Sequence, residues 1–256
     1  MGIEDHLGRT LRDLRISVTD RCNFRCSYCM PKEVYGRDFE FLPHSQILTF
    51  EEITRLAKIF ARLGVRKIRI TGGEPLLRRD LHVLLGSLSA VDGIEDLSLT
   101  TNGALLAGKA DLFAEAGLGR VSVSLDSLDD EVFRSMNDVD FPVDRVLEGI
   151  EAAERARLTP IKVNCVIRRG VNDDGVIEMA RHFHGTPHIV RFIEYMDVGG
   201  TIGWNLDDVV PSSEIVKRID RELPLEPIGA NYRGEVARRY RYRDGGGEIG
   251  VISSVT

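Results

Sequence analysis

The sequence is poor in several features that mark other classes of protein. It contains only four cysteines in 256 residues, and we interpret these as metal ligands or buried thiols in a reducing compartment, not as a disulfide framework. Its 34 basic residues are outnumbered by 40 acidic ones. This deficit of positive charge argues against a general role on nucleic acids or membrane surfaces, because a phosphate backbone needs a basic partner. No apolar run approaches the length of a membrane span.

The beginning of the chain also lacks the marks of a targeting segment. Residues Met1–His6 carry neither the positively charged nor the apolar part of a signal peptide. We therefore expect a cytoplasmic protein. With 43% hydrophobic residues, the chain is long enough for one large α/β domain with a sizeable core.

Three of the four cysteines stand close together. Cys22, Cys26 and Cys29 fall within eight positions, directly after a strand expected over residues 14–18, whereas Cys165 lies far away in the sequence. Thiolates bind soft centres such as zinc and iron–sulfur clusters, and a structural zinc site normally has four ligands. Three thiolates on a cubane cluster leave one iron open for a chelating small molecule. The spacing favours such a cluster, with a zinc site completed by a distant histidine as the alternative.

Strand-like and helix-like stretches alternate along the chain from Arg12 onward. This alternation is typical of βα units stacked around a parallel sheet. Strands are expected at residues 14–18, 67–71, 96–100, 120–125, 161–167 and 189–195. Six such units predict an α/β fold with a partial (β/α)6 barrel of the TIM type, not a closed eightfold barrel. We assign residues 1–198 to this barrel and residues 199–256, with an expected helix and hairpin, to a C-terminal extension.

Apolar and polar residues alternate within these strands, although strands of a parallel sheet covered by helices are normally apolar throughout. In residues 67–71, Ile68 and Ile70 share one face of the strand, and polar side chains occupy the other. If the apolar faces pack under helices, the polar faces line a common interior. That interior would hold four cations, namely Arg15, Lys67, Arg69 and Lys162.

Confined cations call for a partner, because a buried and unpaired charge is very costly. A nucleoside triphosphate carries about the right charge, and arginine guanidinium groups match phosphate oxygens in pairs. The alternative is that these side chains lie at strand ends, in solvent or in ion pairs. The same alternation places Cys165 beside Val163 on an apolar face, which predicts a buried and inert thiol.

Two turns follow strands at the edge where a ligand would bind. Thr71-Gly72-Gly73-Glu74-Pro75 comes between a strand and a helix, so that its backbone N–H groups could approach a ligand, with a simple tight turn as the alternative. Leu99–Gly103 is a second strand-end turn. Residues 103–109 fit a phosphate-binding loop, but Ala110 stands where a Ser or Thr must hold magnesium, and we reject that interpretation in favour of a helix starting within this segment.

The cysteine spacing, with the aromatic Tyr28 just before the last cysteine, resembles the signature of radical S-adenosylmethionine (SAM) enzymes. Within that superfamily, residues 13–22, 67–75 and 191–199 resemble the GTP 3′,8-cyclases, lyases that begin molybdenum-cofactor biosynthesis. The similarity extends over nearly the whole chain. It implies a reductive cleavage of SAM to a 5′-deoxyadenosyl radical, which takes hydrogen from the ribose 3′ carbon of GTP. That carbon then attacks the imidazole ring of the purine.

The resemblance also assigns residues to ligands, without naming any acid or base. It places a [4Fe-4S] cluster on Cys22, Cys26 and Cys29. It places SAM near Tyr28, Gly73, Ser124 and Met196, and it places GTP near Arg15, Arg69, Thr100 and Lys162. The expected product is (8S)-3′,8-cyclo-7,8-dihydroguanosine 5′-triphosphate.

Further partners follow from the same resemblance. It implies an electron donor such as flavodoxin or ferredoxin and the next enzyme of the molybdopterin pathway, and a homodimer is possible. The family continues past the point matching Ser253–Thr256 into three more cysteines that bind a second [4Fe-4S] cluster, and these ligands are absent from this chain. Two alternatives stay open at this point: a radical SAM enzyme acting on a peptide or RNA, and a non-enzymatic zinc-binding module.

Overall fold

The computed structural model describes residues 4–198, 203–232 and 234–254. Its residues divide into two compact units, which are described separately. Unit 1 comprises Met1–Asn23, Glu40–Ser122 and Glu148–Thr159, and unit 2 comprises Phe24–Phe39, Val123–Leu147 and Pro160–Thr256. The expected domain boundary after residue 198 adjoins residues outside the described ranges.

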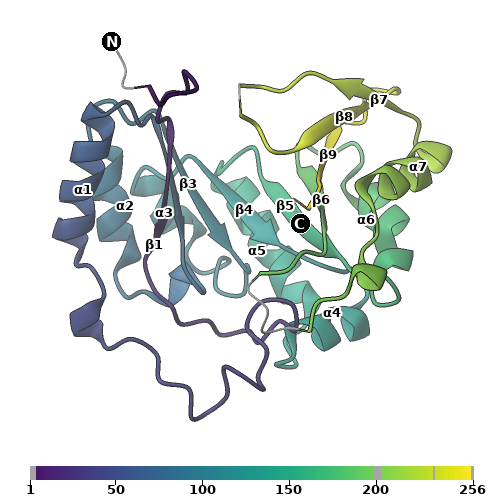
Figure 1. Cartoon of the computed structure of the whole chain (residues 1–256), viewed down its shortest axis with the longest axis horizontal. Helices are drawn as coiled ribbons and strands as arrows, with labels where there is room; N and C mark the ends of the chain where they lie inside the picture. Colours follow the sequence, from purple (N-terminus) through teal and green to yellow (C-terminus); the bar gives the residue numbers. More distant parts are fainter. Residues whose placement is uncertain (1–3, 199–202, 233, 255–256) are drawn as a thin grey trace. The chain divides into compact units, whose positions relative to one another are not determined.

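The described residues form a mixed α/β protein, as predicted (Figure 1). The strands are β1 (Asp13–Ser17), β2 (Lys67–Thr71), β3 (Asp96–Thr101), β4 (Arg120–Ser124), β5 (Lys162–Ile167), β6 (Ile189–Glu194), β7 (Leu225–Ile228), β8 (Arg238–Tyr242) and β9 (Glu248–Ile252). The α-helices are α1 (Phe50–Arg62), α2 (Leu81–Ser89), α3 (Ala110–Glu115), α4 (Asp130–Asn137), α5 (Val143–Arg155), α6 (Val176–Phe183) and α7 (Ser212–Glu222). The strand order is β1-β2-β3-β4-β5-β6-β9-β8-β7, with β4 divided between the units.

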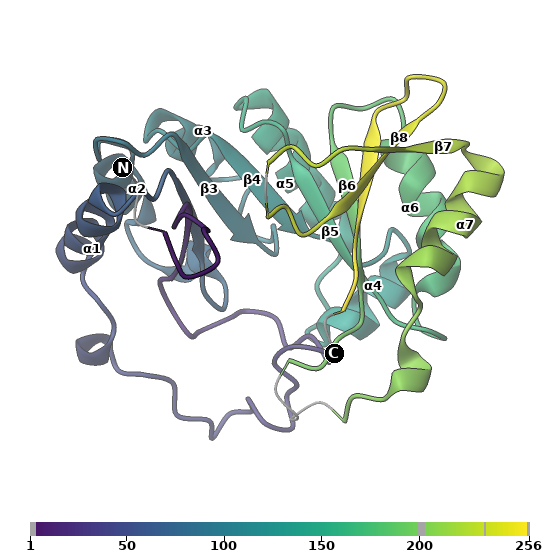
Figure 2. The same cartoon turned by 45° about the horizontal axis from the view of Figure 1, so that its top comes forward.

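Unit 1 is built on the parallel strands β1, β2 and β3. Helix α1 begins at the capping box that the sequence shows, because the Thr49 side chain accepts from the Glu52 amide and the Glu52 side chain accepts from the Thr49 amide. Helices α1 and α2 lie side by side, and α2 packs against β3 (Figures 1 and 2). Apolar side chains of these elements, such as Ile68 and Leu84, are buried between helices and strands.

Unit 2 contains β5, β6, β9, β8 and β7, and only β8 runs against its neighbours among the described pairings. Helices α6 and α7 lie side by side, and both pack on β6 (Figure 2). The expected hairpin is present as β8 and β9. Its arginine-rich strand β8 is not at the sheet edge, because it lies between β9 and β7. The edge is β7, which tolerates Pro227 because an edge strand can lack one amide donor.

The alternation predicted within the strands is clearest in β2 and β5. Ile68 and Ile70 are buried while Lys67 and Arg69 are only half-buried, and β5 repeats the same pattern. Cys165 lies on the buried face of β5 and is 1% exposed, as predicted. Its thiol contacts the Asp126 carbonyl oxygen at 3.4 Å, and burial raises the pKa of this thiol well above its ordinary value. An inert thiol is the expected consequence.

One local expectation was wrong. Residues 103–109 form turns, and α3 begins only at Ala110, because Gly103 has a left-handed φ of 79° and Gly108 precedes the helix. Residues 32–48 are irregular, with turns and a short 3-10 segment, His44–Gln46. The described part of the chain also has no helix with both the length and the apolar character needed to cross a membrane.

Candidate active site

In unit 1, the turn after β2 packs directly on the segment that precedes Cys22. The Gly73 amide donates to the Thr19 carbonyl oxygen at 2.7 Å, and the Glu74 amide donates to the Arg21 carbonyl oxygen at 2.8 Å. A Cβ atom on Gly73 would overlap the Arg21 carbonyl group. The glycine is therefore needed for close approach of two backbone segments. Because the Gly73 and Glu74 amides are already bonded within the protein, they favour the alternative that the sequence left open, a tight turn.

Glu74 fastens this turn to the turn after β3. Its side chain is 1% exposed. One carboxylate oxygen accepts from the Leu76 amide at 2.9 Å and the Thr101 hydroxyl at 2.8 Å, and the other accepts from the Asn102 amide at 2.7 Å. Burial raises the pKa of Glu74, and the three hydrogen bonds oppose that shift. Nothing in the sequence singles out this carboxylate beyond its place after the two glycines.

Asn102, which Glu74 holds by its amide, contacts the first cysteine of the motif. Its carboxamide nitrogen lies 2.8 Å from the Asn23 side-chain oxygen and 3.9 Å from the Cys22 sulfur. Its own side-chain oxygen accepts from the Ala104 amide at 3.1 Å, which closes a turn. Cys22 itself is half-buried and free of any disulfide.

In unit 2, the other two cysteines stand on one tight turn. The amides of Cys29 and Met30 both donate to the Cys26 carbonyl oxygen, at 2.9 and 3.0 Å. Cys26 is half-buried, Cys29 is exposed, and neither is in a disulfide. A set of three free thiols has the donor chemistry that iron–sulfur clusters require. Across the described ranges, no three His, Cys, Asp or Glu side chains are grouped closely enough to hold a metal ion.

Tyr28, between these cysteines, is held by a buried carboxylate that the sequence did not reveal. Its hydroxyl donates to Asp126 at 2.6 Å. The second carboxylate oxygen of Asp126 accepts from the Val166 amide at 2.9 Å, and the Asn172 carboxamide donates to the Asp126 backbone carbonyl at 2.7 Å. Asp126 is 6% exposed, and burial raises its pKa to about 6. Ninety-eight positions separate Tyr28 from Asp126, so no local pattern could have connected them.

Two of the four predicted interior cations lie side by side in unit 1. The register of the parallel strands pairs Arg15 on β1 with Arg69 on β2, and Arg69 with Ser98 on β3. Neighbouring strands are about 4.8 Å apart, and like charges at that spacing repel each other. Arg15 is exposed and Arg69 is half-buried. The register places the two arginines on neighbouring strands, and guanidinium groups brought together there would be stabilised by an anion.

The third cation, Lys67, lies at a strand end in an ion pair, which is the alternative that the sequence left open. It begins β2 and forms an ion pair with Asp13 at 3.2 Å, because the register places Asp13 beside it. We therefore do not assign Lys67 to an anion site. The remaining predicted residues are half-buried: Thr100 near the end of β3, Ser124 at the end of β4, Lys162 at the start of β5 and Met196 just after β6.

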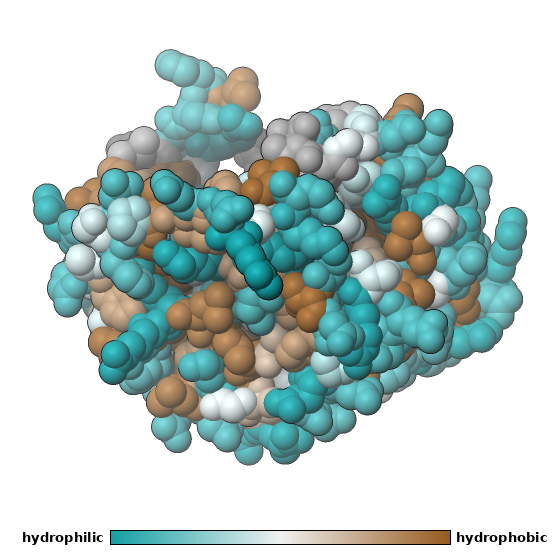
Figure 3. Space-filling model, turned by 90° about the horizontal axis from the view of Figure 1, so that it is seen from below, coloured by the Kyte–Doolittle hydropathy of each residue, from teal (hydrophilic) through white to brown (hydrophobic). Residues whose placement is uncertain are grey.

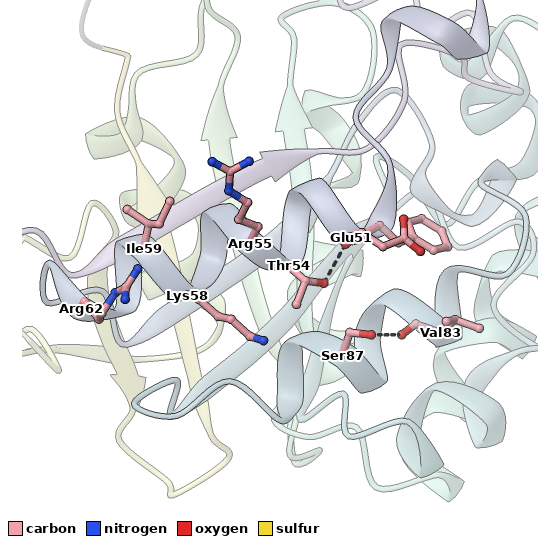
Figure 4. Close-up of a pocket in the computed structure, with 9 residues that line it drawn as sticks. Glu51, Thr54, Arg55, Lys58, Ile59, Arg62, Val83 and Ser87 are labelled. Atoms are coloured by element: carbon pink, nitrogen blue, oxygen red, sulfur yellow. Dashed lines mark hydrogen bonds between the residues drawn. The ribbon is translucent and has the colours of Figure 1, made fainter.

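A separate groove lies on the outer side of unit 1 between α1 and α2 (Figure 4). Its volume is about 640 Å³, and its lining includes Lys58 from α1 together with Val83 and Ser87 from α2. The Thr54 and Ser87 hydroxyls that face it are bonded to carbonyl oxygens of their own helices. None of the predicted site residues lines this groove.

The surface offers little else that points to a ligand. On the face drawn in Figure 3, exposed apolar side chains are interspersed with polar ones. Single exposed apolar residues are ordinary on a protein surface, so we attach no binding role to them.

Comparison with known proteins settles the family. Residues 16–183 match the model of the radical SAM superfamily, and residues 188–256 match the model described as molybdenum cofactor synthesis C. The chain belongs to the radical SAM superfamily. It is 59% identical over 254 residues to the GTP 3′,8-cyclase of Acidothermus cellulolyticus, covering 99% of this chain and 70% of that protein. It is 51% identical to the GTP 3′,8-cyclase of Staphylococcus aureus, covering 99% of this chain and 74% of that one.

These identities place this radical SAM chain in the GTP 3′,8-cyclase family, as its motifs predicted. The superfamily implies a [4Fe-4S] cluster and SAM. Among solved structures, Streptococcus suis SuiB bound to S-adenosylmethionine has a TM-score of 0.66 at 18% identity, covering 82% of this chain and 46% of that one. Methylornithine synthase has a TM-score of 0.62 at 17% identity, covering 82% and 62%. These likenesses confirm the predicted fold, a partial barrel of the radical SAM type.

Proposed function

We propose that this chain converts GTP to (8S)-3′,8-cyclo-7,8-dihydroguanosine 5′-triphosphate in molybdenum-cofactor biosynthesis. The observation that carries the proposal is the register pair of Arg15 and Arg69, in a chain whose relatives are named GTP 3′,8-cyclases. Two adjacent guanidinium groups suit a polyphosphate, because each can bond two phosphate oxygens.

The three cysteines that stand close together in the sequence are assigned to the cluster. Cys22, Cys26 and Cys29 would hold a [4Fe-4S] cluster, and their thiolate chemistry, with none of them in a disulfide, supports this. When bound, the cluster and SAM together supply the 5′-deoxyadenosyl radical that the reaction needs. We assign no side chain as an acid or base.

SAM is assigned to Tyr28, Gly73, Ser124 and Met196. The Gly73 amide is bonded to Thr19, but in the described part of the chain no donor bonds the Gly73 carbonyl oxygen. That oxygen is suited to accept from the amino group of SAM. The Tyr28 ring is held in one orientation by Asp126, so a ligand placed against it would meet a preorganised surface.

GTP is assigned to Arg15, Arg69, Thr100 and Lys162. By fixing the triphosphate, these side chains would keep the ribose and the purine in one position relative to the radical. Such positioning lowers the barrier by avoiding the loss of motional freedom during the reaction.

Several further expectations accompany this function as proposals. They are the division into a barrel over residues 1–198 and an extension over residues 199–256, a cytoplasmic location, and an electron donor such as flavodoxin or ferredoxin. A second [4Fe-4S] cluster, the next enzyme of the molybdopterin pathway and a homodimer likewise stay predictions.

GTP binding to the anaerobically reconstituted enzyme tests the function. We expect Arg15→Ala to weaken GTP binding by about 10- to 100-fold, because a hydrogen bond to a charged group contributes about 1.5–3 kcal/mol. Arg79→Ala is the matched control, because the Arg79 side chain is exposed on unit 1 and, among the described residues, forms an ion pair only with Asp80, at 3.4 Å. Equal and negligible GTP binding by the wild type and by Arg15→Ala would reject the proposal.

A further inference from the structure

Asn102 stands at the centre of a hydrogen-bond network in unit 1 that ends at Cys22. Its carboxamide nitrogen lies 3.9 Å from the Cys22 sulfur, within the longer range of hydrogen bonds to sulfur, and 2.8 Å from the Asn23 oxygen. Sulfur and oxygen are both acceptors, and a carboxamide has two N–H donors, so one nitrogen can serve both at once.

The position of this carboxamide is fixed from the other side by Glu74. The Asn102 amide donates to one carboxylate oxygen of Glu74 at 2.7 Å, and the Thr101 hydroxyl donates to the other at 2.8 Å. The Thr101 oxygen in turn accepts from the Gly103 amide at 3.0 Å. Because Glu74 is 1% exposed, this anchor is shielded from water, and the turn that carries Asn102 has little freedom to move.

We propose that Asn102 is a positioning residue for the cluster, which donates an N–H hydrogen bond to the Cys22 sulfur and thereby raises the reduction potential of the cluster. The inference rests on the proposed function, because it takes Cys22 to be a cluster ligand. Hydrogen bonds to the sulfur ligands help set the potential of iron–sulfur clusters. An N–H dipole directed at sulfur stabilises negative charge there, and the reduced cluster carries one more negative charge than the oxidised one.

A purely local role for Asn102 makes a different prediction. Its side-chain oxygen also closes a turn by accepting from the Ala104 amide at 3.1 Å, and a residue needed only for that turn would not affect the potential. Serine separates the two roles. Its hydroxyl can close the same kind of turn, although more weakly, but it is too short to reach the Cys22 sulfur.

The test uses the reconstituted enzyme without GTP, with the midpoint potential followed by the spin-resonance signal of the reduced cluster. For Asn102→Ser we expect about a tenfold smaller reduction equilibrium constant, which is about 59 mV more negative for a one-electron couple. The control is Asn23→Ala, which removes the other acceptor of the same nitrogen and should leave the potential unchanged. An unchanged potential in Asn102→Ser, with full iron content, would overturn the inference.

A second measurement does not require any Asn102 variant to hold a cluster. Wild-type enzyme made with asparagine labelled with ¹⁵N only in the side chain should show a nitrogen coupling to the reduced cluster in pulsed spin resonance. Asn23→Ala should keep this coupling, and its absence from the wild type would overturn the inference. If the wild type instead takes up zinc and shows no cluster signal, the proposed function itself fails, which is a distinguishable result.

Discussion

The two units each use one buried carboxylate to hold part of the predicted site, but they use it differently. In unit 1, Glu74 accepts three hydrogen bonds, two of them from backbone amides, and so fixes the course of two turns. In unit 2, the Asp126 carboxylate accepts two hydrogen bonds, one from the Tyr28 hydroxyl and one from the Val166 amide. The first of these fixes the orientation of an aromatic ring. Within the described residues neither carboxylate forms an ion pair.

The comparison shows what compensates a buried negative charge when no cation is present. Hydrogen-bond donors alone then stabilise the ionised carboxylate, and a carboxylate with fewer donors is less stable in its charged form. Asp126, with two donors, has a pKa raised to about 6 by burial. The donors also differ in kind, because a backbone amide can only donate, whereas the Tyr28 hydroxyl can donate or accept.

The largest loss of stability should come from adding a side chain at Gly73, where two backbone segments of unit 1 lie in close contact. Gly73→Ala would bring a methyl group into the Arg21 carbonyl group, so one of the two segments must move. We expect the free energy of unfolding to fall by about 3 kcal/mol, since overpacking typically costs 1–3 kcal/mol and backbone atoms yield little. SAM affinity should fall as well. Gly108→Ala is the control, because a Cβ atom there meets nothing within 4 Å, and urea unfolding of both variants makes the measurement.

Neutral replacements should separate the two carboxylates. In Glu74→Gln, the new NH₂ group would face a backbone amide, which can only donate and cannot accept a hydrogen bond. We therefore expect a loss of about 2 kcal/mol in the free energy of unfolding. Asp126→Asn should cost less than about 1 kcal/mol at pH 7, because the Tyr28 hydroxyl can turn and accept. Urea unfolding of both variants decides the matter, and equal losses would contradict the distinction.

A further effect is a pH dependence that comes from the buried carboxylate of unit 2. The pKa of Asp126 is about 6 in the fold against an ordinary 3.8, so the folded chain binds this proton more tightly than the unfolded chain does. The resulting stability is present below about pH 4 and is lost as the pH rises through about 6. Relative to Asp126→Asn, the wild type should lose up to about 3 kcal/mol across this window, at about 1.4 kcal/mol for each pKa unit. Urea unfolding of cluster-free protein between pH 4 and 7 measures the difference, and parallel pH profiles would argue against it.

Local features of the sequence predicted much of the fold. The strand over 67–71 was placed to the residue, and the other five barrel strands within two residues, because alternation of apolar and polar side chains is visible in the strand itself. The short strand β7 escaped notice because Pro227 argues against a strand, and only its place at the sheet edge makes the proline acceptable.

The candidate site was predicted less completely. The spacing of Cys22, Cys26 and Cys29 was evident from the sequence, and so was the basic character of Arg15 and Arg69. Glu74, Asn102 and Asp126 were missed, because a carboxylate or carboxamide shows its role only through partners that lie tens of positions away. Lys67 looked equivalent to Arg69 in sequence, and its ion pair with Asp13 appears only once β1 and β2 are in register.

The sequence by itself determined the kind of ligands that this chain can hold: three thiols at a spacing of four and three positions, and strands with one apolar and one polar face. The tertiary structure decided which cations stand side by side, which amides are already bonded, and which carboxylates are buried. The physical reason is that side-chain type and periodicity belong to neighbouring residues, whereas register, burial and hydrogen-bond partners arise only when distant segments pack together.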